Sequence, residues 1–194
     1  MKGTQLGHAI GHPLTLQAQT AALVICDLQE AFRPVTVGFD AVVARVVKLV
    51  EGMKLLGVPI LVTEQSPQKL GRIVSPILEK LPADVKIVDK SAFSCCGASQ
   101  FTDQLEEARA SQIVLCGLET HICVNQTAQD LIARGHQVHL LLDCVTSRTE
   151  ASRLVGIDKM RLAGVVPCNF EMAMFELMQD AKHEQFKAVQ KLVK

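Results

Sequence analysis

The 194-residue sequence contains neither tryptophan nor tyrosine, and it has no excess of either charge, with 20 Lys plus Arg against 20 Asp plus Glu. Proteins that bind nucleic acid usually present a basic surface and aromatic side chains on which bases stack. Seven phenylalanines are the only aromatic residues here. We therefore expect no nucleic acid partner and no attraction to an anionic membrane.

Long hydrophobic runs are also missing. No uncharged apolar stretch is long enough to span a bilayer, and the first 20 residues lack the continuous apolar segment of a secretory signal. The seven cysteines are an odd number, and Cys26 and Cys116 lie inside apolar runs, as reduced thiols of intracellular proteins do. We expect a cytoplasmic protein with no membrane partner.

What the chain does have is a regular alternation of apolar runs and helical patterns. Strands are predicted at 21–26, 58–63, 85–89, 112–116, 137–143 and 164–167. Helices are predicted at 39–56, 99–109, 122–134 and 150–162, from Asn169 onward, and in the tail 183–194, with a loop at 66–71. Strands that are apolar on both faces and alternate with helices indicate a parallel sheet covered on each side.

The predicted architecture is therefore a three-layer, doubly wound α/β fold of the Rossmann-like kind, with a mostly parallel six-stranded sheet. Residues 20–194 form one domain with a C-terminal helical tail, and residues 1–19 form an N-terminal extension. In such folds the active site lies at the carboxyl ends of the strands. Polar residues just past those ends are the first candidates for chemistry.

Three of these residues make a chemical set. Asp27 follows the first strand, Lys90 follows the third, and the turn after the fourth leads to Cys123. Cys123 opens a helical pattern, where the helix dipole and free backbone N–H groups favour a thiolate. A base, a cation and a nucleophile are the minimum set for acyl transfer through a thioester.

Each of the three also has a purely structural interpretation. An aspartate after a strand is commonly a turn former, a lysine there is commonly solvated, and a free cysteine is commonly a small buried hydrophobic residue. The catalytic interpretation is favoured because Asp27, Lys90 and Cys123 all fall on one edge of the predicted sheet.

Four segments carry a resemblance to a known family, and they are residues 24–32 (VICDLQEAF), 61–65 (LVTEQ), 90–94 (KSAFS) and 117–124 (GLETHICV). They resemble the isochorismatase-like cysteine hydrolases, which are related to nicotinamidases, and most closely the branch of isochorismatase domain-containing proteins. Residues 143–148 and the tail 180–194 fit that branch. The resemblance spans nearly everything after Thr20 and implies the isochorismatase-like hydrolase fold.

The resemblance implies a catalytic triad of Asp27, Lys90 and Cys123. Asp27 would take the thiol proton, Lys90 would hold the thiolate charge, and the thiolate would attack a carbonyl carbon. The family also has a cis peptide shortly before the cysteine, which maps to Leu118–Glu119 in this sequence. That bond would aim the backbone N–H of Glu119, with that of Cys123, at the developing oxyanion.

Two departures narrow the expected reaction. Nicotinamidases hold a metal with an Asp-x-His motif and a further His after the second strand, whereas this chain has Thr-Glu-Gln-Ser-Pro at 63–67. We therefore expect no metal and no cofactor. True isochorismatases lack the nucleophilic cysteine and hydrolyse a vinyl ether, and the presence of Cys123 argues against that reaction.

Other residues near the predicted edge are harder to assign. Phe32, Gln65 and Phe93 are candidates for the wall of a substrate pocket. His121 either forms a dyad with the cysteine two residues on or, as we favour, is a wall residue. Arg148 either binds a substrate anion or, as we favour, caps a helix or pairs with an acid.

The predicted function is a cysteine-dependent hydrolase of a small-molecule carboxamide or related non-peptide C–N bond, acting through a thioester. The alternative is a catalytically weak or inactive member that serves as a protein-interaction scaffold. A nucleotide-binding redox protein is disfavoured, because no Gly-x-Gly-x-x-Gly follows the first strand. Cys95 and Cys96 are predicted to be reduced loop thiols. The apolar last helix and the habit of the family lead us to expect a homo-oligomer.

Overall fold

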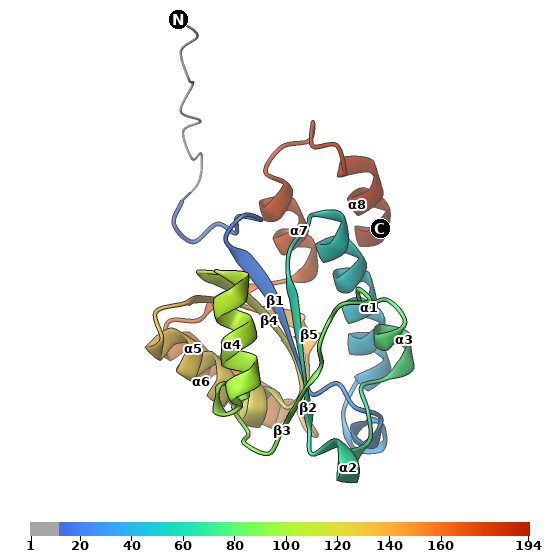
Figure 1. Ribbon diagram of the computed structural model, residues 1–194, viewed down its shortest axis with the longest axis vertical. Helices are drawn as coiled ribbons and strands as arrows, with labels where there is room; N and C mark the ends of the chain where they lie inside the picture. The colour runs from blue at the N-terminus through green and yellow to red at the C-terminus, as the bar shows by residue number, and fades with distance from the viewer. Residues whose placement is uncertain (1–11) are drawn as a thin grey trace, which may run out of the picture.

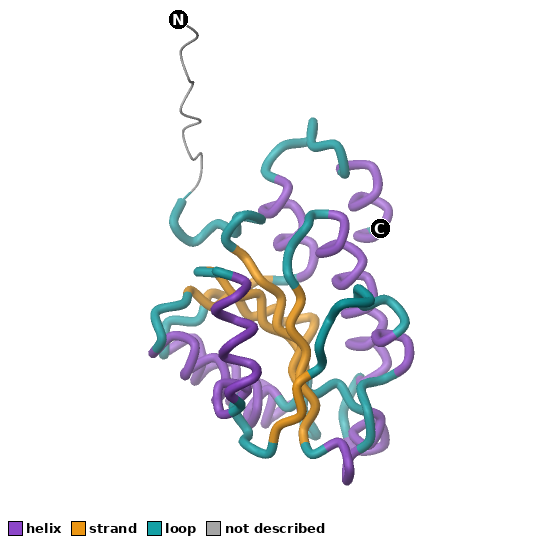
Figure 2. Tube along the Cα trace, in the orientation of Figure 1, coloured by secondary structure: helices purple, strands orange, loops and turns teal. Residues whose placement is uncertain are grey.

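The computed structural model describes residues 12–194, which form an α/β domain around one twisted sheet (Figures 1 and 2). Its strands are β1 (Ala21–Cys26), β2 (Ile60–Gln65), β3 (Val88–Lys90), β4 (Gln112–Gly117), β5 (Gln137–Val145) and β6 (Val166–Cys168). They are ordered β3-β2-β1-β4-β5-β6, and every neighbouring pair is parallel. The doubly wound fold is therefore confirmed, with its switch in strand order between β1 and β4.

Helices cover both faces of the sheet. One face carries α1 (Phe39–Leu55), α3 (Ser75–Leu78), α7 (Phe170–Met178) and α8 (Phe186–Val193), and the other carries α4 (Ser99–Ala108), α5 (Asn125–Ala133) and α6 (Glu150–Leu162) (Figure 1). The shorter turns are η1 (Glu30–Val35), α2 (Pro67–Leu70), η2 (Cys95–Gly97) and η3 (Thr120–Val124).

The sheet divides the apolar interior into two cores. Alternate residues of β1 point to opposite faces, so that Leu23 and Ile25 join the core under α1 and α7, while Val24 and Cys26 join the core under α4, α5 and α6. All six residues of β1 are buried. This two-sided burial explains why the strands read as continuous apolar runs.

The structure corrects several predicted boundaries. Strand β2 begins and ends two residues later than predicted, and the predicted loop at 66–71 contains the single-turn helix α2. Strand β5 runs on to Val145, two residues beyond its predicted end at Asp143. The pairing of β4 with β5 shifts register between Leu115 and Gly117, and this irregularity lets the longer strand continue.

Segments near both ends of the described residues pack against the domain. Of the predicted N-terminal extension, residues 1–11 lie outside the described part, while Leu16 is fully buried and its N–H donates to the Glu176 carboxylate at 3.0 Å. Asn169 caps α7 as predicted, since its side chain accepts the N–H of Met172 at 2.8 Å. The helical tail is present as α8.

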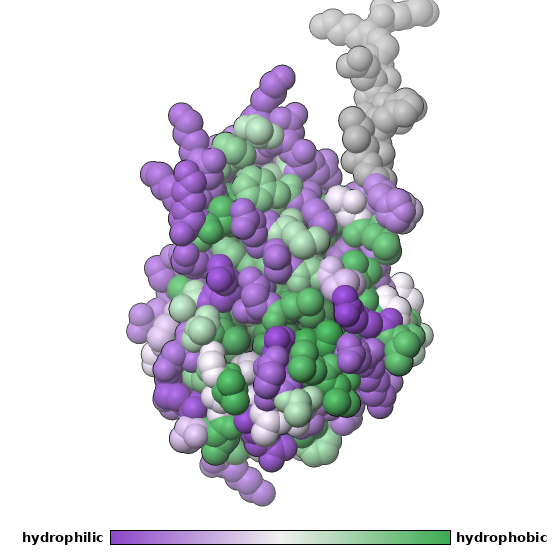
Figure 3. Space-filling view, turned by 180° about the vertical axis from the view of Figure 1, so that it is seen from behind, coloured by the Kyte–Doolittle hydropathy of each residue, from purple (hydrophilic) through white to green (hydrophobic). Residues whose placement is uncertain are grey.

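The back of the molecule carries hydrophobic side chains at its surface (Figure 3). Exposed apolar residues of the domain include Leu154 and Val155 on α6 and Met172 on α7. The methionines of helix α7 therefore differ in burial, since Met174 and Met178 lie in the core and Met172 is exposed. Across residues 12–194, no helix combines the length and the apolar character that crossing a membrane requires.

A buried histidine gives the fold a predictable pH dependence. His139 in β5 is 1% exposed, and burial lowers its pKa to about 4. The unfolded chain takes up this proton near pH 6.5, whereas the folded chain resists it until about pH 4. The free energy of unfolding should therefore fall by up to about 3 kcal/mol as the pH drops through this window.

Urea unfolding at about pH 7 and about pH 4.5 measures this dependence. His139→Leu should remove that part of it, whereas His183→Gln, at a partly exposed histidine near the C-terminus, should keep it. Equal slopes for His139→Leu and the unsubstituted protein would contradict the assignment.

Candidate active site

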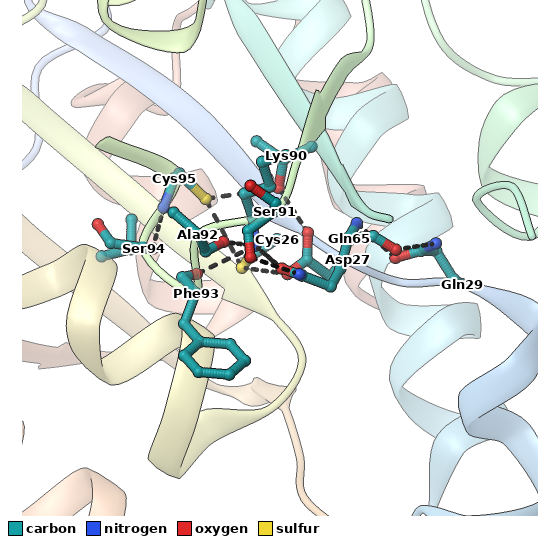
Figure 4. A network of polar contacts seen from close by, with 12 residues as sticks. Cys26, Asp27, Gln29, Gln65, Lys90, Ser91, Ala92, Phe93, Ser94 and Cys95 are labelled. Atoms are coloured by element: carbon teal, nitrogen blue, oxygen red, sulfur yellow. Dashed lines mark hydrogen bonds and ion pairs between the residues drawn. The ribbon is translucent and has the colours of Figure 1, made fainter. Parts of the chain in front are cut away.

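The centre of the site is a buried ion pair at the carboxyl edge of the sheet. Asp27 directly follows β1 and Lys90 is the last residue of β3, and Lys90 Nζ lies 2.6 Å from Asp27 Oδ2 (Figure 4). Their side chains are 1% and 0% exposed. Strand β2 lies between the two strands and supplies further polar groups to the pair.

The ammonium of Lys90 has more acceptors than protons. Besides Asp27, it donates to Gln65 Oε1 at 2.8 Å and approaches the carbonyl oxygens of Phe93 at 3.0 Å and Ala92 at 3.2 Å (Figure 4). Burial by itself would lower the pKa of Lys90, but the ionisable Cys26 thiol and the Asp27 carboxylate beside it raise that pKa well above its ordinary value. The charged form of Lys90 is therefore favoured.

The carboxylate of Asp27 is held on both oxygens. Its Oδ1 accepts the hydroxyl of Thr63 at 2.8 Å, while Oδ2 faces Lys90 and accepts the thiol of Cys26 at 3.5 Å. The backbone of Asp27 has a φ of 54°, in the left-handed region that residues other than glycine seldom adopt. This turn at the end of β1 directs the carboxylate back over the sheet edge.

Cys123 reaches the same edge from β4. It lies in η3, which leads directly into α5, and it is 7% exposed. Gly117 ends β4 with a φ of 121°, and a Cβ there would lie 2.0 Å from the carbonyl oxygen of Cys26. The chain therefore passes hard against β1 before the turn that carries Cys123.

The peptide bond between Leu118 and Glu119 is cis. The carbonyl of Glu119 accepts the N–H groups of Ile122 at 3.0 Å and Val124 at 3.2 Å, which closes the turn around Cys123. The N–H of Glu119 itself has no acceptor among residues 12–194. This free donor next to the thiol has the character that the predicted oxyanion hole needs.

The turn is also tied to the loop after β5. Arg148 Nε lies 2.7 Å from Glu119 Oε1, so this arginine pairs with an acid, as we favoured. The N–H and hydroxyl of Thr120 both donate to the Thr146 carbonyl, at 3.0 and 2.8 Å. His121 Nδ1 lies 3.0 Å from Ser147 Oγ, so the ring is engaged with a serine and not with a thiol.

The three candidates for a pocket wall lie in different surroundings. Gln65 contacts the ion pair directly, because it accepts from Lys90 and donates to the Ser91 carbonyl at 2.9 Å. Phe93 is 55% exposed, and its ring points away from the ion pair in Figure 4. Phe32 lies in η1, partly buried against the core of the α1 face. The structure therefore brings only Gln65 of the three onto the charged centre.

Three residues of the site, Cys26, Thr63 and Cys95, were not among the predicted candidates. Thr63, near the end of β2, bonds Asp27, and Cys95 Sγ lies 3.4 Å from Thr63 Oγ1 and 3.7 Å from Cys26 Sγ. The N–H of Cys95 donates to Thr127 Oγ1 at 2.9 Å, which fixes η2 against α5. The available signal was position, since Thr63 sits at a predicted strand end and Cys95 follows Lys90 by only a short loop.

The surroundings of the site are polar on one side. A hollow of about 620 Å³ runs beside the edge strand β3 and is lined by Arg72, Asp89, Lys90, Ser91 and Gln100, among others. Asp27 and Cys123 do not line it. Within the part of the chain that the structure describes, no three His, Cys, Asp or Glu side chains form a set that could hold a metal ion.

Curated relatives match over most of the chain. Isochorismatase domain-containing protein 2A of Mus musculus is 38% identical over 178 residues, which are 91% of this chain and 84% of the relative. Isochorismatase domain-containing protein 2 of Bos taurus is 40% identical over 177 residues, 90% and 83% of the two chains.

Solved structures agree with this likeness. A structure described as MAR1 ribonuclease from Caenorhabditis elegans superposes with a TM-score of 0.89 at 34% identity, over 92% of each chain. The YcaC gene product of Escherichia coli, described as an octameric hydrolase of unknown specificity, shares the fold with a TM-score of 0.86 at 20% identity, over 92% of this chain and 88% of that one. The model of the isochorismatase domain matches residues 21–172, and the chain belongs to the isochorismatase-like hydrolase family.

Proposed function

We propose that this protein is a cysteine-dependent hydrolase that cleaves a small-molecule carboxamide or related C–N bond through a thioester on Cys123. The observation that carries the proposal is the buried pair of Asp27 and Lys90, 2.6 Å apart, beside a thiol at the start of a helix. A buried carboxylate and a cation next to a nucleophile are typical of a catalytic centre. Family membership supports a hydrolase and leaves the reaction open.

Each group has a step in the proposed reaction. Asp27 takes the proton of the Cys123 thiol, and Lys90 stabilises the negative charge that then sits on sulfur. The thiolate attacks the carbonyl carbon, and the free N–H of Glu119 donates to the oxygen as it becomes negative. Asp27 returns its proton to the departing amine. Water then attacks the thioester, again with Asp27 as base, and releases the acid.

The similar Caenorhabditis elegans structure is described as a ribonuclease, so phosphodiester cleavage is the other reaction to consider. The charges of this site favour a carbonyl substrate over a phosphodiester. The cation nearest the thiol, Lys90, is 0% exposed at its side chain and already shared among four acceptors, so it has no donor left for a phosphate. An RNA oligonucleotide therefore belongs in the substrate panel as a compound that we expect to remain intact.

Trapping the acyl group tests the proposal. An activated aryl ester of a short carboxylic acid, mixed with the protein and quenched in acid, should leave one acyl group on Cys123, located by peptide mass spectrometry. The acyl group should disappear when quenching is delayed, because water cleaves the thioester. Stable acylation, or acylation of Cys95 in place of Cys123, would overturn the proposed mechanism. Small carboxamides assayed for released ammonia then define the substrate.

A further inference from the structure

The sheet sorts six of the cysteines into two groups. Cys26, Cys95 and Cys123 belong to the core under α4, α5 and α6, beside the candidate active site. Cys116, Cys144 and Cys168 belong to the core on the opposite face. All six are free thiols. The reaction proposed above uses Cys123 alone, so the two thiols that accompany it are unexplained.

These three thiols form a connected chain with Cys26 in the middle. Cys26 Sγ lies 3.7 Å from Cys95 Sγ (Figure 4), and the Cys123 thiol is near enough to Cys26 to help raise the pKa of Cys26. Cys26 and Cys95 are 0% exposed, while Cys123 is 7% exposed. A small oxidant that enters the site therefore reaches Cys123 first. An oxidised Cys123 can then react with its neighbour Cys26.

The charges around the chain favour transfer away from Cys123. Burial, together with the neighbouring Cys123 and Cys95 thiols, raises the pKa of Cys26. Burial also opposes ionisation of Cys95, yet its hydrogen bond with Cys26 and the charge of Lys90 lower the pKa of Cys95 below its ordinary value. Of the two thiols, 3.7 Å apart, Cys95 is therefore the better attacking thiolate for the last exchange step.

We propose that Cys26 and Cys95 form a resolving pair that removes peroxide damage from Cys123 by taking the oxidation into a buried disulfide. The proposal rests on the function proposed above only in that both treat Cys123 as the reactive thiolate. The co-reactant is a peroxide such as hydrogen peroxide, and the final disulfide is returned to two thiols by a cellular dithiol reductant.

The steps balance as follows. The Cys123 thiolate and hydrogen peroxide, with one proton, give a sulfenic acid and water. The Cys26 thiol gives its proton to the Asp27 carboxylate that it faces at 3.5 Å, and the resulting thiolate attacks the sulfenic sulfur. An S–S bond forms between Cys26 and Cys123, and the sulfenic hydroxyl leaves with that proton as a second water. The Cys95 thiolate then attacks Cys26, so the new S–S bond joins Cys95 to Cys26 and the Cys123 thiolate is released.

Peptide mass spectrometry after a peroxide pulse tests the proposal, with remaining thiols blocked by iodoacetamide. In the unsubstituted protein we expect a Cys26–Cys95 linkage and an alkylated Cys123. Cys95→Ala should stop one step earlier, with a Cys26–Cys123 linkage. Cys26→Ala should form neither linkage, and its Cys123 should reach the irreversible sulfinic acid severalfold faster. Cys116→Ala, a buried thiol of the other core, is the matched control and should behave like the unsubstituted protein.

Several outcomes would overturn the inference. One is a sulfinic Cys123 in the unsubstituted protein while Cys26 and Cys95 remain alkylated thiols. Another is an unchanged rate of sulfinic acid formation in Cys26→Ala, and a third is a fully linked product in Cys95→Ala. If Cys26→Ala fails to fold, the stalled intermediate in Cys95→Ala still decides. The readout is mass alone, so a failure of the proposed hydrolase activity, seen in acylation, is distinguishable from a failure of this inference.

Discussion

Replacing Cys123 by alanine should lower the rate of hydrolysis by at least about 10³-fold, because Cys123 forms the thioester in the proposed reaction and the two neighbouring thiols, Cys26 and Cys95, are fully buried. Asp27 and Lys90 would remain paired and the fold would be retained, since Cys123 is a small side chain in a core that tolerates a slightly smaller one. The kcat for the best carboxamide found in the panel, measured beside the unfolding free energy, checks this result.

Cys96→Ala is the matched control for that substitution. Cys96 follows Cys95 directly, is partly buried, and has its pKa raised to about 11 by burial. It therefore holds no thiolate at neutral pH, and its removal should leave kcat unchanged. Activity in Cys123→Ala within a factor of ten of the unsubstituted protein would remove Cys123 as the nucleophile.

The pairing of Asp27 with Lys90 was predictable from the sequence because the ends of parallel strands converge. Asp27 and Lys90 each follow an apolar run, and such runs place their last residues at one edge of a doubly wound sheet. The side-chain period of the strands then puts Asp27 within reach of Lys90, although β2 lies between β1 and β3. The resemblance to the hydrolase family added the cis bond at Leu118–Glu119, which neither periodicity nor composition indicates.

The site contacts that the sequence did not predict depend on loops and on where the strands end. Cys95 was read as a loop thiol, because nothing in its sequence neighbours says that η2 folds back onto Thr63 and Cys26. Gln65 was read as a pocket wall, and its bond to Lys90 follows from β2 extending two residues beyond the predicted end. Contacts of this kind are decided by tertiary packing, to which local patterns are blind.

Breaking the Asp27–Lys90 ion pair should also lower the free energy of unfolding strongly. Lys90→Met removes the cation that faces Asp27 and leaves a buried carboxylate with the Thr63 hydroxyl and the Cys26 thiol as its donors. Removing one partner of a buried pair costs about 3–5 kcal/mol, because the other charge stays uncompensated. We expect that loss in the free energy of unfolding by urea at neutral pH, and a loss of activity with it.

The contacts predict an asymmetry within the pair. Asp27→Asn leaves the ammonium of Lys90 with Gln65 and two backbone carbonyls, so it should cost less stability than Lys90→Met. For the same reason, Lys90→Met combined with Asp27→Asn should be more stable than Lys90→Met alone, because it buries no unpaired charge. The activity should be lost in all three variants, since each lacks the base or the cation.

Lys80→Met is the matched control, because it makes the same chemical change in a pair with Glu51 at a similar distance, 2.7 Å, but with the lysine 46% exposed. Water already solvates these charges, so the cost should stay below about 1 kcal/mol. Equal losses in Lys80→Met and Lys90→Met would mean that the Asp27–Lys90 pair is worth no more than a surface contact. A larger loss in Asp27→Asn than in Lys90→Met would mean that the three remaining acceptors around Lys90, from Gln65, Ala92 and Phe93, do not hold its charge without the carboxylate.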